Sequence, residues 1–409
     1  MRILVVSQHC WPEPFNVLET CEMLQQSGHD VTVLTGLPNY PHGVIAEEYR
    51  HRKNRVQEKC GVRIVRSWLY PRGATLSGFG KIRRMANYIS FAFAASNASL
   101  LKKQDFDVVL CMQFSPILMA IPALRHAERR NVPCIIYSFD LWPEDILAGG
   151  MTKRSLLYKM MTRVSRRIYE RADIIGITSP DFQRYFVDYL GVEGPEYCYL
   201  PQYAEKMFER IEAPRLAEEG GVVNITFAGN VGSNQAIDNV IRAAALMDSR
   251  VEVRIHIVGS GSKLEECKRL AKELNVENVV FHGRQPLETM PAYYASADAL
   301  LLPFAKSAEG SLVTSYTIPR KFQSYLAAGR PIICSADGII SELVERKSIG
   351  FACPAEDPSA LASVISEFAD AKASEVVEMG KRARALYDED FSRKQFIERI
   401  NEMLRLVAE

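Results

Sequence analysis

The sequence predicts an α/β protein with two Rossmann-like domains, each built on a parallel sheet, that face a central cleft. Short β-branched runs recur along the chain, and a segment of helix length separates each run from the next. Strands that alternate with helices form parallel sheets with right-handed crossovers. A polar stretch, residues 202–221, divides the runs into two series. A chain of 409 residues is also too long for one core, which favours two or three domains.

The expected strands define these domains. In the first half they cover Ile3–Ser7, Val31–Thr35, Val62–Val65, Val108–Cys111, Cys134–Ser138 and Ile174–Thr178. In the second half they cover Asn224–Ala228, Arg254–Val258, Val279–His282, Ala299–Leu302, Pro331–Cys334 and Gly350–Cys353. We therefore expect an N-terminal domain over residues 1–200, a linker over 201–221, a C-terminal domain over 222–390 and a terminal helix over 391–409.

Composition and charge exclude several classes of protein. Hydrophobic residues make up 47% of the chain and charged residues 24%, as in soluble globular proteins, which excludes a disordered or fibrous chain. The net charge of +1 conceals a basic segment, residues 50–103, with 13 lysines and arginines and a single acid, Glu58. Such a surface predicts an anionic partner, and without a nucleic-acid recognition module an anionic membrane is favoured over nucleic acid. Arg83 and Arg84 are the candidate contacts, with an ordinary solvated helix as the alternative.

The cysteines and the apolar segments predict a cytoplasmic protein. The nine cysteines are scattered without a CxxC pair or zinc-ligand spacing, as expected for reduced thiols. The chain begins directly with an expected strand, and no run of 18 uncharged apolar residues is present.

Ligands of open α/β sheets bind at the carboxyl ends of the strands, so the residues after each run are the candidate site. His9 follows the first expected strand, and Asp140 follows the fifth. Side chains of this kind can bind ligand hydroxyl groups or act as a base. The alternatives are structural, since lone histidines more often serve the fold, and the adjacent Glu144 and Asp145 suit the first turn of a helix.

Gly229 and Gly232 follow an expected strand and precede an expected helix, Ala236–Met247, and Gly259 follows the next strand. Such a turn lets the backbone approach a phosphate, and the helix N-terminus supplies amide donors. An ordinary tight turn is the alternative, because this spacing alone is a weak signal. The third glycine of a dinucleotide fingerprint is absent, which argues against an NAD enzyme.

Lys321 lies in the first turn of an expected helix that begins near Pro319. The helix dipole disfavours a cation at that end, so a lysine there suggests an anion bound beside it. A solvated lysine is the alternative.

Nine segments, taken together in their order and spacing, form a pattern that is specific for one protein family. They are Gly28–Gly36, Pro38–Pro41, Asp140–Glu144, Ala172–Ile175, Leu200–Pro201, Ala228–Gln235, Val258–Gly261, Asn278–Arg284 and Pro319–Pro331. Over nearly the whole chain they resemble the retaining glycosyltransferases of family 4, which have the GT-B fold. The resemblance is strongest to the branch that builds bacterial O-antigen and capsule oligosaccharides, including N-acetyl-fucosaminyl and colanic-acid fucosyl transferases.

The resemblance implies that the C-terminal domain binds a nucleotide-sugar, usually a UDP-sugar, and the N-terminal domain the acceptor. Gly229, Asn230 and Gly232 would line the diphosphate, Lys321 would offset its charge, and Arg284 would lie near the base. The full set of candidate donor-binding residues is Gly229, Asn230, Gly232, Gln235, Gly259, Arg284, Glu309, Lys321 and Ser324.

The sequence departs from the family at three places. The Glu-x7-Glu pair is absent, and its positions hold Tyr316 and Ser324, the second being where a Glu usually holds the ribose hydroxyls. Glu309 lies nearby and is the candidate replacement for the first. Val231 and Gln235 stand near the places of the usual Arg and Lys. The glycine-rich first loop is replaced by residues 12–16, of which Asn16 is a candidate acceptor contact.

We therefore expect retaining transfer from a UDP-sugar to a polyprenyl-diphosphate-linked saccharide at the inner face of the cytoplasmic membrane. No metal or other cofactor is expected to be required, and Asp140 and His9 are the candidates for positioning sugar hydroxyls. Two alternatives remain open. One is another enzyme of the same fold, such as a nucleotide-sugar epimerase or a phosphorylase. The other is a non-catalytic subunit that binds a glycolipid or a partner enzyme, which the missing Glu pair favours.

Overall fold

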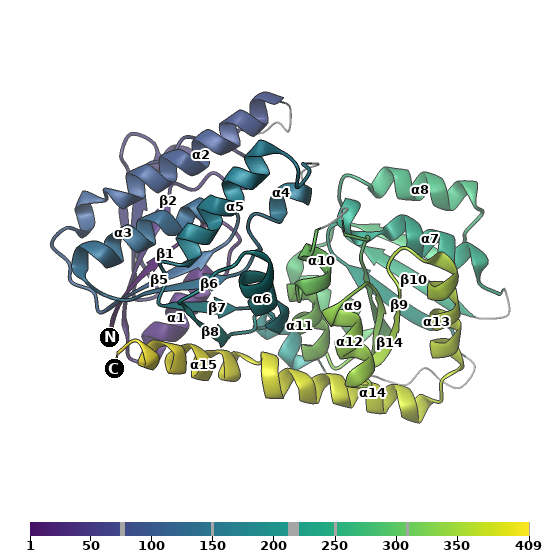
Figure 1. Ribbon diagram of the computed structural model, residues 1–409. Helices are drawn as coiled ribbons and strands as arrows, with labels where there is room; N and C mark the ends of the chain where they lie inside the picture. The colour runs from purple at the N-terminus through teal and green to yellow at the C-terminus, as the bar shows by residue number, and fades with distance from the viewer. Residues whose placement is uncertain (74–77, 149–150, 212–220, 249–251, 308–310, 409) are drawn as a thin grey trace. The chain divides into compact units, whose positions relative to one another are not determined.

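The computed structural model describes residues 1–73, 78–148, 151–211, 221–248, 252–307 and 311–408. They divide into two compact units (Figure 1). Unit 1 comprises Met1–Leu200 and Ile397–Glu409, and unit 2 comprises Pro201–Phe396. The last helix, α15 (Arg393–Leu406), therefore begins in unit 2 and ends in unit 1.

Unit 1 contains an eight-stranded sheet in the order β3-β4-β2-β1-β5-β6-β7-β8. Its strands are β1 (Arg2–Val6), β2 (Asp30–Gly36), β3 (Val56–Lys59), β4 (Val62–Ser67), β5 (Val108–Gln113), β6 (Cys134–Ser138), β7 (Ile174–Ile177) and β8 (Glu196–Tyr199). The central strands β5 and β6 are buried at every position. Helices cover both faces of such a sheet, which is why these strands are continuous apolar runs in the sequence.

Two edge strands of unit 1 were not predicted. β3 pairs antiparallel with β4, whereas the other neighbours in this sheet are parallel. Cys60 and Gly61 join β3 to β4, and both have positive φ, which makes a tight hairpin turn possible. β8 lies at the opposite edge and is only partly buried. Both strands have polar residues on open edges, so they lack the apolar run that identifies an inner strand.

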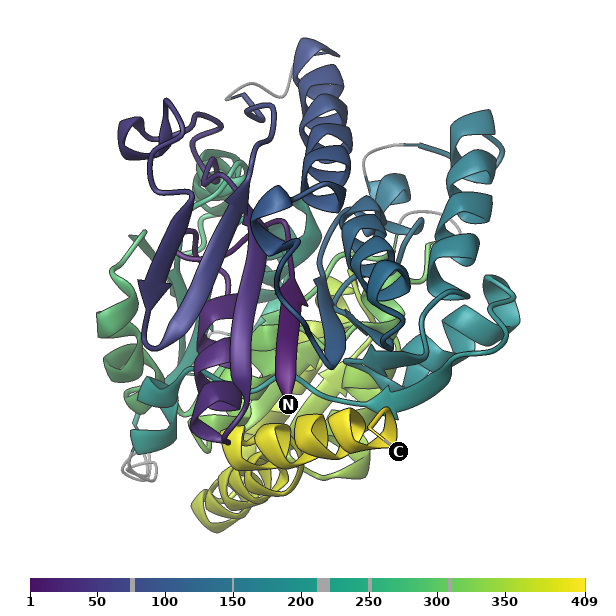
Figure 2. The ribbon, with the colours of Figure 1, turned by 90° about the vertical axis from the view of Figure 1, so that its left-hand side faces the viewer.

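The α-helices of unit 1 are α1 (Val17–Gln26), α2 (Gly78–Ser96), α3 (Ala120–Arg130), α4 (Asp145–Ala148), α5 (Leu156–Tyr169) and α6 (Pro180–Arg184). Figure 1 shows α2, α3 and α5 on one side of the sheet and α1 on the other. Figure 2 shows α1 beside the C-terminal turns of α15, where the Nε2 atom of His29 lies 2.8 Å from Oδ1 of Asn401. No helix in the described part of the chain is long and apolar enough to cross a membrane.

Unit 2 contains a six-stranded, wholly parallel sheet in the order β11-β10-β9-β12-β13-β14. The strands are β9 (Val223–Ala228), β10 (Val253–Val258), β11 (Val279–Gly283), β12 (Ala299–Pro303), β13 (Ile332–Ser335) and β14 (Gly350–Cys353). The helices are α7 (Ile237–Leu246), α8 (Leu264–Glu273), α9 (Met290–Ala295), α10 (Val313–Tyr316), α11 (Arg320–Ala327), α12 (Ile339–Arg346), α13 (Pro358–Asp370) and α14 (Ala373–Leu386). Two apolar clusters, one on each face, form its core.

The predicted architecture of two α/β domains is confirmed, and each of the twelve expected strands is present. The helix expected at residues 236–247 begins one residue later, at Ile237, because Ala236 has a left-handed φ of +37°. A short 3-10 turn, Ser233–Gln235, precedes it. The turn that contains Gly229 and Gly232 therefore does not lead directly into α7.

Candidate functional site

A cavity of about 440 Å³ lies within unit 2, at the carboxyl ends of its central strands. It brings together six of the predicted donor-binding residues from four separate segments: Gly229, Asn230, Gly259, Arg284, Lys321 and Ser324. Apolar and aromatic side chains complete part of its wall, among them Phe208, Met290 and Tyr294. The rings of Phe208 and Tyr294 are stacked with centroids 4.7 Å apart.

Backbone hydrogen bonds between three successive strand ends form one side of the cavity. Gly229 N–H donates to Val258 C=O at 2.8 Å, and Gly259 N–H donates to Gly283 C=O at 2.8 Å. A Cβ atom added at Gly259 would lie 1.7 Å from the carbonyl oxygen of Gly229, and Gly259 also has a φ of +152°. Only glycine fits this crossing, and its small size lets the backbone come close to a ligand.

Lys321 lies in the first turn of α11, and its ammonium group has no hydrogen-bond partner in the described structure. Its Nζ atom lies 4.3 Å from the centroid of the Phe227 ring, and a Cβ atom at Gly229 would lie 2.5 Å from it. Burial lowers the pKa of Lys321 to about 8. Lys321 is therefore largely buried, whereas the alternative considered from the sequence was a lysine exposed to water. A desolvated cation beside a glycine turn favours an anionic ligand.

Glu205 adds a carboxylate to the same cavity, and it was not predicted from the sequence. Its Oε2 atom accepts a hydrogen bond from the Ser324 hydroxyl at 2.9 Å. Its Oε1 atom lies 3.3 Å from Nη2 of Arg320. Glu205 precedes the short helix η5 (Lys206–Arg210), in the segment expected to be a linker, where no sequence motif marks it. The cavity therefore combines a cation near the glycine turns with a carboxylate that contacts α11.

Three predicted donor-binding residues are not among the lining residues of this cavity. Gly232 and Gln235 lie in the adjoining turn, where Gly232 is buried and the side-chain oxygen of Gln235 has no hydrogen-bond partner in the described structure. Glu309 lies outside the described residues.

In unit 1, His9 belongs to a buried pair that the sequence only partly indicated. The Nδ1 atom of His9 lies 2.6 Å from Oε2 of Glu13. The other oxygen of Glu13 accepts backbone N–H groups from Asn39 at 2.6 Å and from Tyr40 at 2.7 Å. The ring of His9 stacks on Phe15, with centroids 4.6 Å apart. Glu13 thus fixes the orientation of the imidazole and ties the loops after β1 and β2 together.

Asp140 lies at the end of β6, beside a second carboxylate. Its Oδ2 atom accepts the backbone N–H of Ser115 at 2.7 Å, and the hydroxyl of Ser115 donates to Asp145. The indole N–H of Trp142 donates to that hydroxyl at 2.8 Å. Burial raises the pKa of Asp140, and burial and then the neighbouring Asp140 charge raise the pKa of Asp145 well above its ordinary value. Ser115 thus holds both carboxylates, one through its backbone N–H and the other through its hydroxyl.

Aromatic rings connect the loops that carry His9 and Asp140. Phe15 contacts Phe114 with centroids 5.2 Å apart, and Phe114 stacks on Phe139 at 4.3 Å. Because β1, β5 and β6 are neighbours in the sheet, their carboxyl ends form one edge. His9 and Asp140 therefore lie along the same edge of unit 1, as predicted, with the aromatic rings between their loops.

The remaining predicted residues of unit 1 lie on helices or directly before them. Asn16 directly precedes α1, and its backbone carbonyl accepts the N–H of Thr20 at 3.0 Å. Arg83 and Arg84 lie on α2, where Arg83 is exposed. Glu144, predicted to serve the fold, accepts a hydrogen bond from the hydroxyl of Tyr158. Within the described residues, no three His, Cys, Asp or Glu side chains are grouped closely enough to hold a metal ion.

Comparison with known protein families gives two adjacent matches. Residues 16–202 match a glycosyl transferase 4-like domain, and residues 223–371 match the glycosyl transferases of group 1. Among curated proteins, a probable glycosyltransferase of Pseudomonas aeruginosa, WbjE, is 25% identical over 285 residues, which cover 68% of each chain. A putative colanic acid biosynthesis glycosyl transferase of Escherichia coli K12, WcaI, is 22% identical over 356 residues, which cover 82% of this chain and 84% of WcaI.

Solved structures share the fold at low sequence identity. A sucrose-phosphate synthase from Thermosynechococcus elongatus superposes with a TM-score of 0.75 at 17% identity, and covers 99% of this chain and 98% of its own. Anabaena HepE, solved in complex with UDP and glucose, has a TM-score of 0.68 at 14% identity and covers 99% of both chains. WaaG, a glycosyltransferase of lipopolysaccharide biosynthesis, has a TM-score of 0.64 at 14% identity and covers 100% of this chain and 99% of its own.

Proposed function

Because the chain belongs to the glycosyltransferases of the GT-B fold, with a 4-like domain followed by a group 1 domain, we propose that it transfers a sugar from a UDP-sugar to a lipid-diphosphate-linked saccharide. The acceptor we propose is a polyprenyl-diphosphate-linked oligosaccharide of a cell-surface polysaccharide. The names of two relatives support this class of product, since WcaI and WcaL of Escherichia coli are both named for colanic acid biosynthesis.

The cavity of unit 2 carries the donor part of the proposal. A nucleoside diphosphate needs a cation near its phosphates and a backbone that can come close to them. Lys321 supplies the cation, and the absence of side chains at Gly229 and Gly259 permits the close approach. UDP as the nucleotide is supported by structural neighbours, since HepE was solved with UDP and with UDP-glucose. In the transfer step, charge develops on the departing diphosphate, and a preorganised cation stabilises that charge.

Unit 1 carries the acceptor part of the proposal. His9, held by Glu13, and Asp140, held by Ser115, position hydroxyl groups of the acceptor along one edge of the sheet. We propose transfer with retention and without a covalent carboxylate intermediate, so that an oxygen of the leaving phosphate takes the proton of the acceptor hydroxyl. The balance is then one glycosidic bond broken, one formed and one proton transferred to UDP. No metal or other cofactor is proposed to take part.

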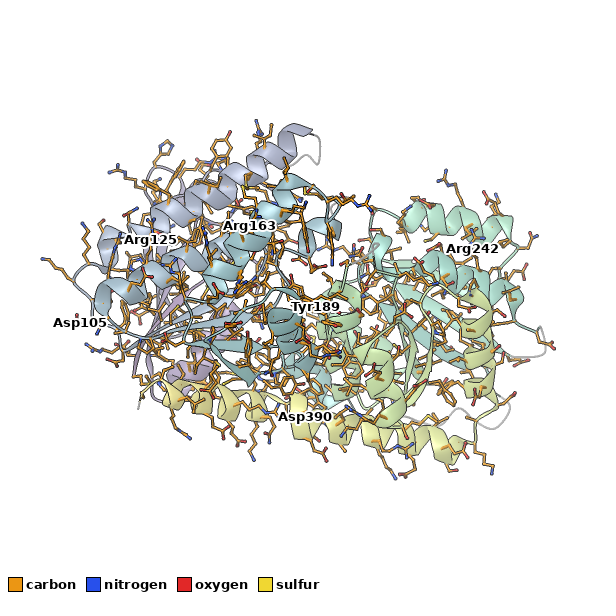
Figure 3. All side chains as sticks on the ribbon, viewed as in Figure 1. Asp105, Arg125, Arg163, Tyr189, Arg242 and Asp390 are labelled. Atoms are coloured by element: carbon orange, nitrogen blue, oxygen red, sulfur yellow. The ribbon has the colours of Figure 1, made fainter. Side chains whose placement is uncertain are left out.

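The surface of α2 supports peripheral binding to an anionic membrane. Ile82, Ile89 and Phe93 are apolar but 67%, 54% and 71% exposed, and they recur at helical spacing. Arg83 accompanies them on the same helix, and Figure 3 shows Arg163 on another helix of unit 1, α5. Exposed apolar residues next to basic ones are typical of helices that lie in the interface of anionic bilayers. We propose that this surface brings unit 1 to the lipid-linked acceptor at the inner face of the cytoplasmic membrane.

A binding screen followed by a transfer assay tests the proposed function. The thermal midpoint of the full chain is measured with UDP, GDP, ADP, dTDP, CMP and NAD, since saturation to about 100 times the dissociation constant adds roughly 2.7 kcal/mol of stability. We expect a shift with UDP. A GDP shift in its place would contradict the UDP assignment but keep the reaction class. Absence of any nucleotide shift in folded protein would favour a non-catalytic subunit.

The transfer assay then uses UDP-sugars with a polyprenyl-diphosphate-linked acceptor. We expect a product whose new linkage has the anomeric configuration of the donor, as determined by NMR. Inversion would overturn the retaining mechanism. A UDP-sugar converted to its epimer without an acceptor would favour the epimerase alternative.

A further inference from the structure

We propose that Glu205 holds the ribose hydroxyl groups of the donor and makes the site select ribonucleotides over 2′-deoxyribonucleotides. The inference rests on the proposed function, because it assigns a role within the donor cavity. Glu205 precedes the sheet of unit 2 in sequence and lines the cavity from a segment separate from the strand ends and from α11.

The contacts of Glu205 leave its carboxylate available to a ligand. A carboxylate has about four acceptor positions, and the Ser324 hydroxyl and the Arg320 guanidinium account for two. The side chain is 26% exposed, and it lines the cavity together with both partners. The Ser324 oxygen also lies 3.2 Å from the backbone carbonyl oxygen of Arg320, so its single proton is shared between that carbonyl and the carboxylate of Glu205. The carboxylate of Glu205 is therefore held against the first turns of α11 by Ser324 and Arg320.

The chain on both sides of Glu205 is anchored in the core. Tyr203 and Ala204 before it are fully buried, and Phe208 after it is 2% exposed. Tyr203 contacts Phe396, with ring centroids 4.7 Å apart, and Phe208 stacks on Tyr294. A charged side chain between such anchors is preorganised, so little conformational entropy is lost when a ligand binds to it.

The chemistry around Glu205 identifies the part of the donor that it meets. A carboxylate repels phosphate and accepts hydrogen bonds from hydroxyl groups. Lys321 and Ser324 are three residues apart and therefore lie on the same face of α11, one turn from each other. Phe208 and Tyr294 provide an aromatic wall in the same cavity. A carboxylate that lines the same cavity as a phosphate-binding cation and an aromatic wall matches the ribose, which joins the diphosphate to the base.

The test compares UDP with 2′-deoxy-UDP by isothermal titration calorimetry. The wild-type chain is expected to bind UDP roughly tenfold or more tightly than 2′-deoxy-UDP, because hydrogen bonds to a charged group are among the stronger ones. In Glu205→Gln, the affinity for UDP is expected to fall to within about twofold of that for 2′-deoxy-UDP, because the charge-assisted bonds are lost. Ser324→Ala is expected to reduce the discrimination partly, because it only positions the carboxylate.

Glu209→Gln is the matched control. Glu209 lies in the short helix that follows Glu205, accepts a hydrogen bond from the hydroxyl of Tyr387 at 2.6 Å, and does not line the cavity. We expect this variant to keep the wild-type ratio of UDP to 2′-deoxy-UDP affinity. The exchange variant, Glu205→Ser with Ser324→Glu, is expected to recover at least part of the discrimination that Glu205→Gln loses. Recovery would exclude a purely structural role for Glu205, because the exchange removes its own contacts.

The outcomes separate this inference from the proposed function. A wild-type chain that binds UDP and 2′-deoxy-UDP equally would overturn the role of Glu205 while leaving the UDP-sugar donor in place. A folded wild-type chain that binds no UDP would overturn the proposed function itself. If Glu205→Gln weakened UDP-glucose but left UDP unchanged, the carboxylate would hold the transferred sugar, which also contradicts the ribose assignment.

Discussion

Replacing Lys321 with methionine is expected to stabilise the ligand-free protein and to weaken its binding of UDP. The side chain is largely buried, and its ammonium group has only the Phe227 ring as a favourable contact in the described structure. Methionine has a similar length and no charge, so it fills the same space without the cost of burying a cation. If Lys321 lowers the stability of the ligand-free protein, its presence is best explained by its binding of a ligand.

The magnitude follows from the pKa of Lys321. A pKa of about 8 in place of the ordinary 10.5 corresponds to about 3 kcal/mol against the charged amine in the folded state at neutral pH. The side chain borders the cavity and keeps some contact with water, so we expect a gain of about 1–3 kcal/mol in the free energy of unfolding. The UDP affinity is expected to fall by roughly tenfold to a hundredfold, as is typical for the loss of a charge-assisted contact.

Urea denaturation at pH 7 measures the stability, and calorimetry measures the UDP affinity. Lys263→Met is the matched control, because Lys263 lies in the same unit but is exposed and paired with Glu266 at 2.7 Å. Its stability is expected to change by no more than about 0.5 kcal/mol, with no change in UDP binding. A destabilised Lys321→Met variant, or one with wild-type UDP affinity, would refute the reasoning.

The same lysine predicts opposite pH dependences for binding and for stability. Above pH 8 the ligand-free amine loses its proton, so the UDP affinity is expected to fall, by at most about tenfold per pH unit. The folded pKa lies below the unfolded value of 10.5, so between these values the unfolded chain binds more protons. The contribution of this group to stability therefore rises with pH across that interval. Lys321→Met is expected to remove both dependences, measured by titration calorimetry and urea denaturation from pH 7 to 10.

Three further substitutions test other parts of the structure. Gly259→Ala is expected to abolish UDP binding and lower the thermal midpoint, because its Cβ atom would lie 1.7 Å from a backbone oxygen. Gly283→Ala is the control, because Gly283 has open space around it. Its positive φ is expected to reduce the free energy of unfolding by only about 1 kcal/mol. His9→Gln is expected to lower kcat/KM for the acceptor by roughly a hundredfold while calorimetry finds UDP affinity unchanged; an unaltered rate would remove His9 from the site. Phe93→Asp on α2 is expected to reduce sedimentation with anionic vesicles several-fold, whereas Val187→Asp on another exposed part of unit 1 should not.

The sequence was sufficient to predict the inner strands and the residues that follow them. A strand buried on both faces needs an apolar run, as at Cys134–Ser138, which coincides with β6. The residues after these runs then lie at one edge of the sheet, which is why the sequence alone places Gly229 and Gly259 together. β3 was missed because an exposed edge strand needs no apolar run, and its sequence is Val-Gln-Glu-Lys.

The residues missed at the site make contacts over long sequence distances. Glu205 and Ser324 are 119 residues apart, and Glu13 accepts backbone N–H groups 26 and 27 residues away. No spacing rule connects such positions, because the packing of separate elements brings them together. The sequence indicates only that Glu13 belongs to the loop of residues 12–16. A carboxylate that accepts hydrogen bonds from backbone N–H groups cannot be told from a solvated carboxylate by sequence alone.

The contact between Glu205 and Ser324 gives a different explanation for the serine at position 324, where the family usually has a glutamate. Judged from the sequence, serine in place of glutamate removes a carboxylate from α11 and favours a subunit without activity. In the structure, the serine hydroxyl donates to the carboxylate of Glu205, so the cavity keeps a negative charge beside this helix. A glutamate at position 324 would place a second carboxylate next to that of Glu205, and two neighbouring carboxylates repel each other. Serine at 324 and glutamate at 205 are therefore best explained as a matched pair, and the serine alone is no evidence of lost donor binding.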